Sequence, residues 1–154
     1  MALLLLLQKK WLHLNNDPRI VSVNILTEVL LKNQSLKEEF DLQVECLDKR
    51  DRAFVKNLVY GVLRIKQSID ISIQKYYQKS YKKLNEKHKN IFRIGVYQID
   101  RMNSVPNYAS VNTTVEIAKK ESLKFSKRVN AILMNFIRNK DVLQKSNKDL
   151  TLNH

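Results

Sequence analysis

Residues 51–64, which read DRAFVKNLVYGVLR, decide the fold class of this chain. Their apolar residues recur in pairs every three to four positions, which is the period of an α-helix with a broad buried face. The pairs are Phe54–Val55, Leu58–Val59 and Val62–Leu63. This breadth predicts the central helix of the fold, which packs on more than one side. We expect Asp48 to cap this helix and expect it to be the longest. Gly61 costs a helix interior about 1 kcal/mol relative to alanine, so we expect another helix to cross closely there.

Helical periodicity continues on both sides of this segment. Helix starts are predicted at Asp17-Pro18, at Ser35 (which forms a capping box with Glu38) and at Asn85. Apolar stripes predict further helices near residues 69–76, 111–118 and 126–137, with loops at 81–84 and 103–107. The 154 residues include only two glycines and two prolines, too few for the turns of a sheet protein. The sequence therefore predicts an all-α fold, a compact bundle of about seven helices.

The predicted domain occupies residues 17–140. We interpret residues 1–16 as an N-terminal extension, either disordered or included by a start set too early; a helix with a leucine-rich stripe is the alternative. The apolar pattern fades from Asp141, so residues 141–154 are expected to form a flexible tail or the start of a linker. Cys46 falls in a helical stretch with no histidine nearby, and we interpret it as a buried core thiol.

The positive charge of the chain is unevenly distributed. The formal net charge is +13; residues 1–60 hold nine Lys/Arg and eight Asp/Glu, whereas residues 61–154 hold nineteen and seven. An excess confined to one part of a folded domain favours a polyanionic partner, either nucleic acid or an anionic membrane. The alternative is a lysine-rich solvated surface that reflects a compositionally biased genome.

The sequence lacks the common motifs for catalysis and for metal or cofactor binding. It contains no GxGxxG, P-loop or GxSxG motif, and its three histidines show no metal-ligand spacing. No apolar run approaches the roughly 18–20 residues that a bilayer demands. A single cysteine cannot form an internal disulfide, which suits a reducing cytoplasm. We therefore expect a cytoplasmic, non-enzymatic domain with no catalytic residue, metal site, cofactor or membrane contact.

Two basic stretches form the candidate nucleic-acid surface. The first covers residues 75–83, where lysines are interleaved with Tyr76, Tyr77 and Tyr81, and the second covers residues 119–128. Lysines neutralise phosphates and release counterions, while tyrosines can stack on unpaired bases. For each tyrosine taken singly, a core position with the hydroxyl at the surface is the better explanation.

Four blocks of sequence resemble the NusB family. They are Asp51-Arg52-Ala53-Phe54 with residues 58–64 (LVYGVLR), residues 92–98 (FRIGVYQ), Val105-Pro106 with Val111-Asn112, and residues 129–133 (VNAIL). Each block is weak alone, but the four stand in the family's order and span about residues 19–138. The strings are most similar to the N-terminal region of the RsmB (Sun/Fmu) methyltransferases, which make 5-methylcytosine in small-subunit ribosomal RNA. Thr113 and Met134 depart from the pattern, where Glu and Arg are usual.

The resemblance implies an RNA-binding domain that precedes a separate methyltransferase domain. We predict the non-catalytic targeting module of a 16S rRNA (cytosine-5) methyltransferase, with ribosomal RNA as the expected partner. One alternative is a stand-alone transcription antitermination factor of the NusB type, which would bind RNA together with a ribosomal protein. A second alternative is a helical protein–protein adaptor whose positive charge is incidental.

The predicted site residues combine the basic stretches with the matched blocks. The RNA-binding residues are Arg19, Arg64, Lys75, Lys79, Lys82, Lys83, Arg93, Lys127 and Arg128. For Arg64 and Arg93 the competing explanation is a structural ion pair with Asp70 or Glu116. Structural roles are predicted for Gly61, Gly95, Asn112 and Asn130. The two asparagines match characteristic asparagines of the family, and part-buried asparagines can bond backbone amides of a neighbouring helix.

Overall fold

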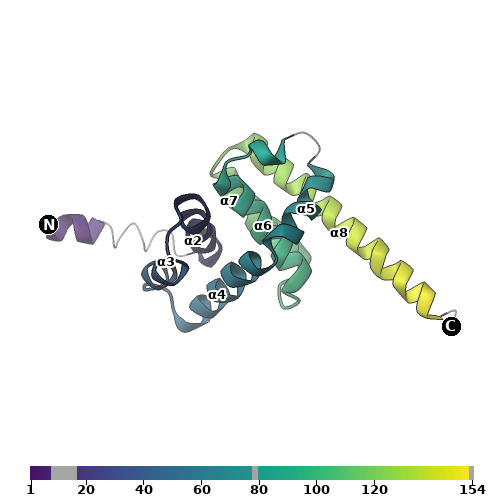
Figure 1. Cartoon of the computed structure of the whole chain (residues 1–154), viewed down its shortest axis with the longest axis horizontal. Coiled ribbons are helices and arrows are strands. Elements are labelled where there is room, and N and C mark those ends of the chain that lie inside the picture. The colour runs from purple at the N-terminus through teal and green to yellow at the C-terminus, as the bar shows by residue number, and fades with distance from the viewer. Residues whose placement is uncertain (8–16, 78–79, 153–154) are drawn as a thin grey trace.

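The computed structural model describes the backbone of residues 1–7, 17–77 and 80–152, and the side chains of these ranges as far as Lys140. Within them seven α-helices, α2 to α8, follow one another from Pro18, and no strand occurs (Figure 1). A short helix over residues 2–7 precedes them, and its leucines are exposed. The rest of the predicted extension, residues 8–16, lies outside the described residues. The structure confirms the predicted all-α fold of about seven helices.

The first three of these helices begin at the predicted caps. In α2 (Pro18–Lys32) the carboxylate of Asp17 accepts a hydrogen bond from the Arg19 amide at 2.9 Å. In α3 (Leu36–Gln43) the cap is the Ser35 hydroxyl. In α4 (Lys49–Arg64) it is the Asp48 carboxylate, 2.8 Å from the Asp51 amide. These oxygens satisfy amides that have no partner within the helix, and so they fix where each helix begins.

The second half of the chain departs from prediction in one of its two predicted loops and agrees with it in the other. After a break at Ile65 the chain forms α5 (Lys66–Tyr76), and the stretch predicted as a loop at 81–84 contains a short 3-10 helix, η1 (Tyr81–Lys83). Next come α6 (Glu86–Arg101), capped by Asn85 as predicted, and α7 (Asn107–Lys119). The predicted loop at 103–107 separates these two helices, ending as α7 begins.

Helix α8 (Leu123–Leu152) is longer at both ends than the sequence indicated. It begins three residues before the predicted Ser126, because the Ser122 hydroxyl accepts a hydrogen bond from the Phe125 amide at 3.0 Å and caps the first turn. It continues to Leu152, so residues 141–152 are helical where a flexible tail or linker was expected. Figure 1 shows this second half of α8 extending beyond the rest of the bundle.

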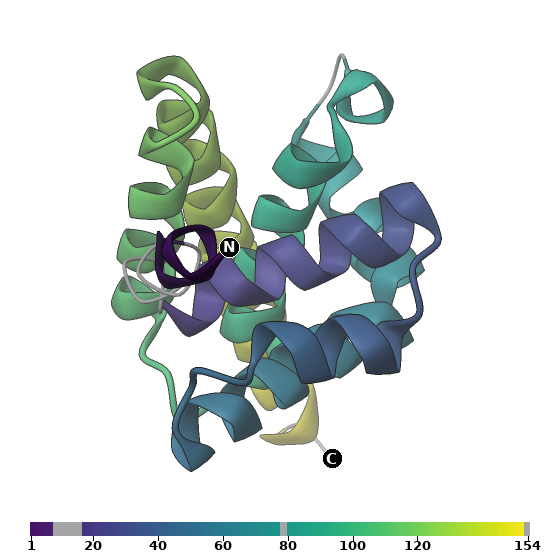
Figure 2. The same cartoon turned by 90° about the vertical axis from the view of Figure 1, so that its left-hand side faces the viewer.

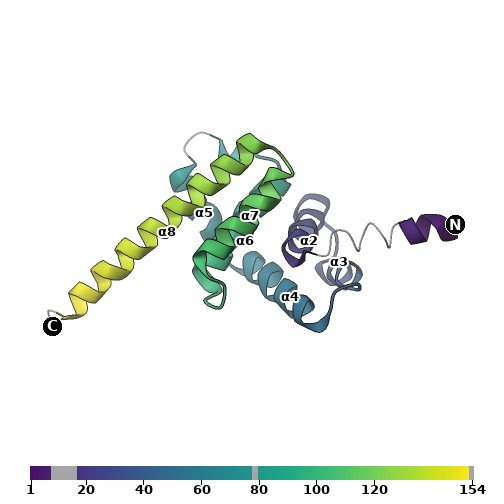
Figure 3. The ribbon, with the colours of Figure 1, turned by 180° about the vertical axis from the view of Figure 1, so that it is seen from behind.

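The central helix of the bundle is α6, and the prediction that residues 48–64 hold this place was wrong. Ten consecutive residues of α6, from Asn90 to Ile99, are buried. The helix contacts α2, α4, α5, α7 and α8, and Figures 2 and 3 show it enclosed by them. Helix α4 equals it in length with 16 residues, and α8 is the longest with 30. The broad apolar face of α4 is explained by simultaneous packing on α2 and α6.

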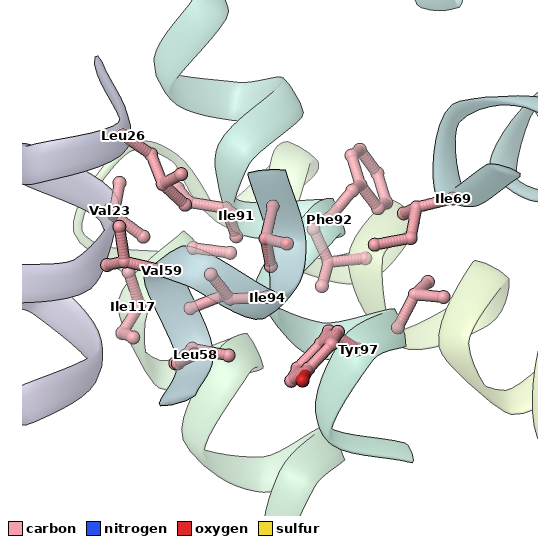
Figure 4. Packing of buried hydrophobic residues seen from close by; sticks show 14 of the residues in the cluster. Val23, Leu26, Leu58, Val59, Ile69, Ile91, Phe92, Ile94, Tyr97 and Ile117 are labelled. Carbon is pink, nitrogen blue, oxygen red and sulfur yellow. The ribbon is translucent and has the colours of Figure 1, made fainter. Parts of the chain in front are cut away.

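Apolar side chains from these helices meet in one core (Figure 4). Both glycines lie where helices cross closely, as was predicted for Gly61. A Cβ atom on Gly61 of α4 would overlap the phenol ring of Tyr97 on α6. A Cβ atom on Gly95 would lie 2.9 Å from Leu133 Cδ1 and 3.1 Å from Thr114 Cγ2. Glycine at these two positions therefore sets how closely α6 approaches α4, α7 and α8.

Cys46 is exposed, so its interpretation as a core thiol was wrong. Helix α3 ends at Gln43, and Cys46 lies in the turn that leads to α4. The apolar contacts of this stretch are made by Val44 and Leu47, which are 4% and 5% exposed. The sequence predicted a helical stretch at Cys46, but the chain leaves the helix before this residue.

Candidate nucleic-acid interface

Arg93 is the most deeply buried of the predicted RNA-binding residues, at 3% exposed. Its Nε and Nη2 atoms donate hydrogen bonds to the two carboxylate oxygens of Asp70 on α5, at 2.8 and 3.0 Å. Its Nη1 atom donates to Asn90 Oδ1 at 2.8 Å and to Glu86. All three nitrogens are thus engaged inside the fold. Arg93 forms the structural ion pair that the sequence offered as the alternative. We therefore exclude Arg93 from the candidate RNA surface.

The same ion pair fixes the position of η1. The Tyr81 hydroxyl donates to Asp70 Oδ1 at 2.5 Å, and burial together with this hydrogen bond raises the pKa of Tyr81. Burial also raises the pKa of Asp70, but the hydrogen bonds from Arg93 and Tyr81 outweigh it, so the pKa lies below its ordinary value. An ionised Asp70 therefore joins α5, η1 and α6. Lys82 and Lys83, which follow Tyr81, are exposed on this anchored segment.

The two basic stretches meet at one end of the bundle, although they are far apart in the sequence. Arg128 Nη1 near the start of α8 donates to the Tyr77 hydroxyl after the end of α5, at 3.1 Å. Figure 2 shows η1 and the start of α8 at the same end of the molecule. Lys82 and Lys83 on η1 and Lys127 and Arg128 on α8 are all exposed. We call these four residues the basic end.

Aromatic packing holds the start of α8 against α6 beneath the basic end. The Phe125 ring stacks on His88, with ring centroids 3.9 Å apart and planes 15° apart. The edge of the same ring meets Phe92, whose centroid lies 5.5 Å away. Since Phe125 is 5% exposed, this contact is part of the core and fixes the place of the neighbouring Lys127 and Arg128.

The sequence did not reveal an ion-pair cluster at the turn between α7 and α8. Glu121 contacts Lys87 Nζ and His88 Nε2, the latter at 3.4 Å. Burial raises the pKa of Glu121, but the hydrogen bond and charge of Lys87 and the contact with His88 outweigh it, so the pKa lies below its ordinary value. These residues are more than thirty positions apart, and no local pattern links them. The cluster neutralises the acidic residue nearest the start of α8.

The remaining predicted RNA-binding cations differ in how far they are exposed. Arg19 is half-buried between helices: its Nε donates to Gln98 Oε1 at 2.7 Å and its guanidinium lies 4.9 Å from the centroid of Phe54. Arg64 is exposed at the end of α4, and no ion pair joins it to Asp70 or Glu116 in the part of the chain that the structure describes. Lys75 is exposed near the end of α5, and Lys79 lies outside the described residues.

Asn112 and Asn130 are exposed on α7 and α8, and the predicted part-buried structural role was wrong. Neither side chain forms a hydrogen bond with another described residue. Their neighbours Val111 and Val129 are the buried ones, at 4% and 0% exposed. Because successive residues of an α-helix are rotated by about 100°, a residue next to the centre of the buried face points outward.

The described residues hold neither a metal-binding cluster nor a membrane-spanning helix. Across residues 1–7, 17–77 and 80–140, no three His, Cys, Asp or Glu side chains are grouped so that they could hold a metal ion. None of the described helices combines the length and the apolar composition needed to cross a bilayer.

Known proteins resemble this chain in both sequence and fold. The profile of the NusB family matches residues 16–138. A probable ribosomal RNA small subunit methyltransferase B of Synechocystis sp. is 37% identical over 98 residues, which cover 63% of this chain and 22% of that protein. The transcription antitermination protein NusB of Clostridium novyi is 33% identical over 111 residues, 71% of this chain and 80% of that protein. The chain thus spans between a fifth and a third of the length of the methyltransferases that it matches.

Two solved structures have the same arrangement of helices. NusB of T. maritima superimposes with a TM-score of 0.72 at 22% identity, covering 79% of this chain and 88% of that one. A chain in the crystal structure of a plectonemic RNA supercoil also gives 0.72, at 25% identity, covering 81% and 94%. Profile, relatives and fold agree, and the chain belongs to the NusB family.

Proposed function

We propose that this chain is an RNA-binding domain that contacts RNA through the basic end. We further propose that it serves as the non-catalytic targeting module of a 16S rRNA (cytosine-5) methyltransferase. The observation that carries the proposal is the convergence of two separate basic stretches on one surface, held by the hydrogen bond between Arg128 and Tyr77. A polyanion is the partner that such a surface attracts, because each phosphate contact releases condensed counterions.

The charges of the basic end are uncompensated, which supports this use of the surface. Among the described residues none of its four cations forms an ion pair, and Arg128 donates to a neutral phenol. The nearby acidic residues are already paired: Asp70 with Arg93, and Glu121 with Lys87. The positive field therefore extends into solvent, whereas the deeply buried Arg93 contributes to stability.

The methyltransferase role is supported by the 37% identity to the Synechocystis protein and by the strings at residues 58–64, 92–98 and 129–133. In that role the methyl transfer belongs to other parts of the protein, and this chain incubated with S-adenosylmethionine and ribosomal RNA transfers no methyl group. Methyl incorporation above a protein-free control would contradict the non-catalytic assignment.

The second candidate function is a stand-alone antitermination factor, favoured by the 80% coverage of the Clostridium novyi protein.

The RNA-binding proposal is tested by titrating salt in an RNA-binding assay. The test variant replaces Lys82, Lys83, Lys127 and Arg128 with glutamine. The matched control replaces three lysines and one arginine that are exposed on α3 and α4: Lys37, Lys49, Arg50 and Lys56. For single-stranded RNA each lost phosphate contact reduces the slope of log K against log salt by about 0.7, so the test variant loses up to about 3.

The control variant has the same net charge as the test variant. We expect it to retain most of the parent's RNA affinity and most of the slope of log K against log salt. Equal losses in the two variants would mean that RNA responds only to total charge and that the basic end is ordinary solvated surface. Absence of RNA binding by the parent even at low salt would refute the proposal and leave the protein–protein adaptor as the better explanation.

A further inference from the structure

A pocket of about 250 Å³ opens where α5, α6 and α8 meet. Its apolar wall includes Ile69 and Val96, both 3% exposed, and the ring of Phe136. Drug-sized ligands occupy pockets of roughly 300–1,000 Å³, so a space of this size suits a group of one or two rings. The pocket is separate from the basic end but lies along α8, the helix that also carries Lys127 and Arg128.

One edge of the pocket carries hydrogen-bonding groups of both kinds. Asn139 Nδ2 donates to the Tyr76 hydroxyl at 2.8 Å, which joins α8 to α5. Among the described residues, the hydroxyl proton of Tyr76 and the carboxamide oxygen of Asn139 have no further partner. A donor and an acceptor side by side match the edge of a nucleobase, and asparagine pairs with bases in this bidentate way. The Tyr76 and Phe136 rings add aromatic surface on which a base can stack.

The rim of the pocket is cationic. Lys75 and Arg101 line it and are exposed. Arg101 Nε donates to Asp100 Oδ2 at 2.8 Å, and the Arg101 side chain remains 59% accessible. Lys140 Nζ donates to the Ile99 and Asp100 carbonyl oxygens at 2.9 and 3.3 Å, so it links α8 to the C-terminal end of α6. Three cations and one carboxylate, that of Asp100, leave a positive balance around an apolar interior. An anionic ligand with a planar ring fits this combination.

We propose that this pocket binds one unstacked base of the bound RNA, with a neighbouring phosphate at Lys75 or Arg101. The proposal rests on the RNA-binding function proposed above and deepens it. The basic end would hold the RNA backbone, and the pocket would add a base contact farther along α8. Along α8 the path from Arg128 to Asn139 is about 16 Å, given the rise of 1.5 Å per residue.

The test uses a variant that fills the pocket and a control on the same helix. Ser72 lines the pocket, so Ser72→Trp occupies it; Gln74 is exposed on α5 and does not line it, so Gln74→Trp is the control. The probes are a short single-stranded RNA of mixed sequence and a series of the same RNA with one base removed at each position in turn. Circular dichroism and melting curves verify that both variants fold.

We expect one position at which base removal weakens binding to the parent and to Gln74→Trp by about tenfold. Ser72→Trp should bind the intact RNA about tenfold more weakly than the parent, with no further loss when that base is removed. If Ser72→Trp binds the intact RNA like the parent, the pocket proposal is overturned while RNA binding stands. Equal weakening by Ser72→Trp on every RNA, including the RNA that lacks the critical base, also overturns it. A parent that binds none of these RNAs refutes the proposed function itself.

Discussion

Replacing Arg93 with methionine should destabilise the domain strongly, because Arg93 joins α5 to α6 through its ion pair with Asp70. Methionine keeps most of the apolar volume but removes four hydrogen bonds, two to Asp70, one to Asn90 and one to Glu86. Breaking one side of a buried ion pair costs about 3–5 kcal/mol. The Asp70 and Glu86 side chains are each 19% exposed and keep some contact with water, so we expect the lower end, about 3 kcal/mol.

The free energy of unfolding is measured by urea denaturation followed by circular dichroism, and the melting temperature should fall by about 10 °C for a domain of this size. Asp70→Asn and the double variant complete a thermodynamic cycle, in which we expect a coupling of at least about 1 kcal/mol. Lys82→Met, on the exposed part of η1, is the control and should change stability by less than about 0.5 kcal/mol. A loss below about 1 kcal/mol for Arg93→Met would refute the assignment of Arg93 to the structural core.

The pH dependence supplies an independent check of the same ion pair. The pKa of Asp70 is lower in the folded protein than its ordinary value, so the native state binds this proton less readily than the unfolded state. Its contribution to stability is therefore complete above the unfolded pKa of about 3.9 and is lost as the pH falls through the lower folded pKa. The difference in stability between the parent and Arg93→Met should shrink in that acidic range. A difference that stays constant down to the acid transition would contradict the role of the Asp70 charge.

Three further predictions concern packing and exposure. Gly61→Ala should destabilise the domain despite the better helix propensity of alanine, because its Cβ overlaps the Tyr97 phenol. The same change should become neutral or stabilising in a Tyr97→Leu background. A Gly61→Ala variant that melts above the parent would contradict the close crossing of α4 and α6. Cys46 should react with a thiol reagent in the native state at the rate of an unstructured thiol, without loss of helical signal, because it is exposed in a turn; protection until unfolding would show that the thiol is buried after all. Alanine at Asn112 or Asn130 should change stability by less than about 0.5 kcal/mol in urea denaturation, because both side chains are exposed; a loss above about 1 kcal/mol would restore the structural role that the sequence suggested.

Local patterns in the sequence were sufficient for the helices themselves. The caps at Asp17, Ser35, Asp48 and Asn85 are where the sequence put them, because capping depends on a few neighbouring residues and their backbone amides. The all-α class followed from apolar periodicity and from the scarcity of glycine and proline, which are also local properties. Even the close crossing at Gly61 could be predicted, since a glycine in a helix interior needs a packing reason.

Which side chains reach solvent was decided by the tertiary structure. The predicted RNA surface included both Arg93 and Lys82, yet Arg93 is buried against Asp70 and Lys82 is exposed. Likewise the sequence could not show that Tyr77 and Arg128 would meet, or that the two basic stretches are one surface. The sequence determined the helices and the net charge because these depend on residue type and short-range spacing. Whether each cation is buried or exposed depends on contacts between helices that are distant in the chain, and only the packed bundle fixes those contacts.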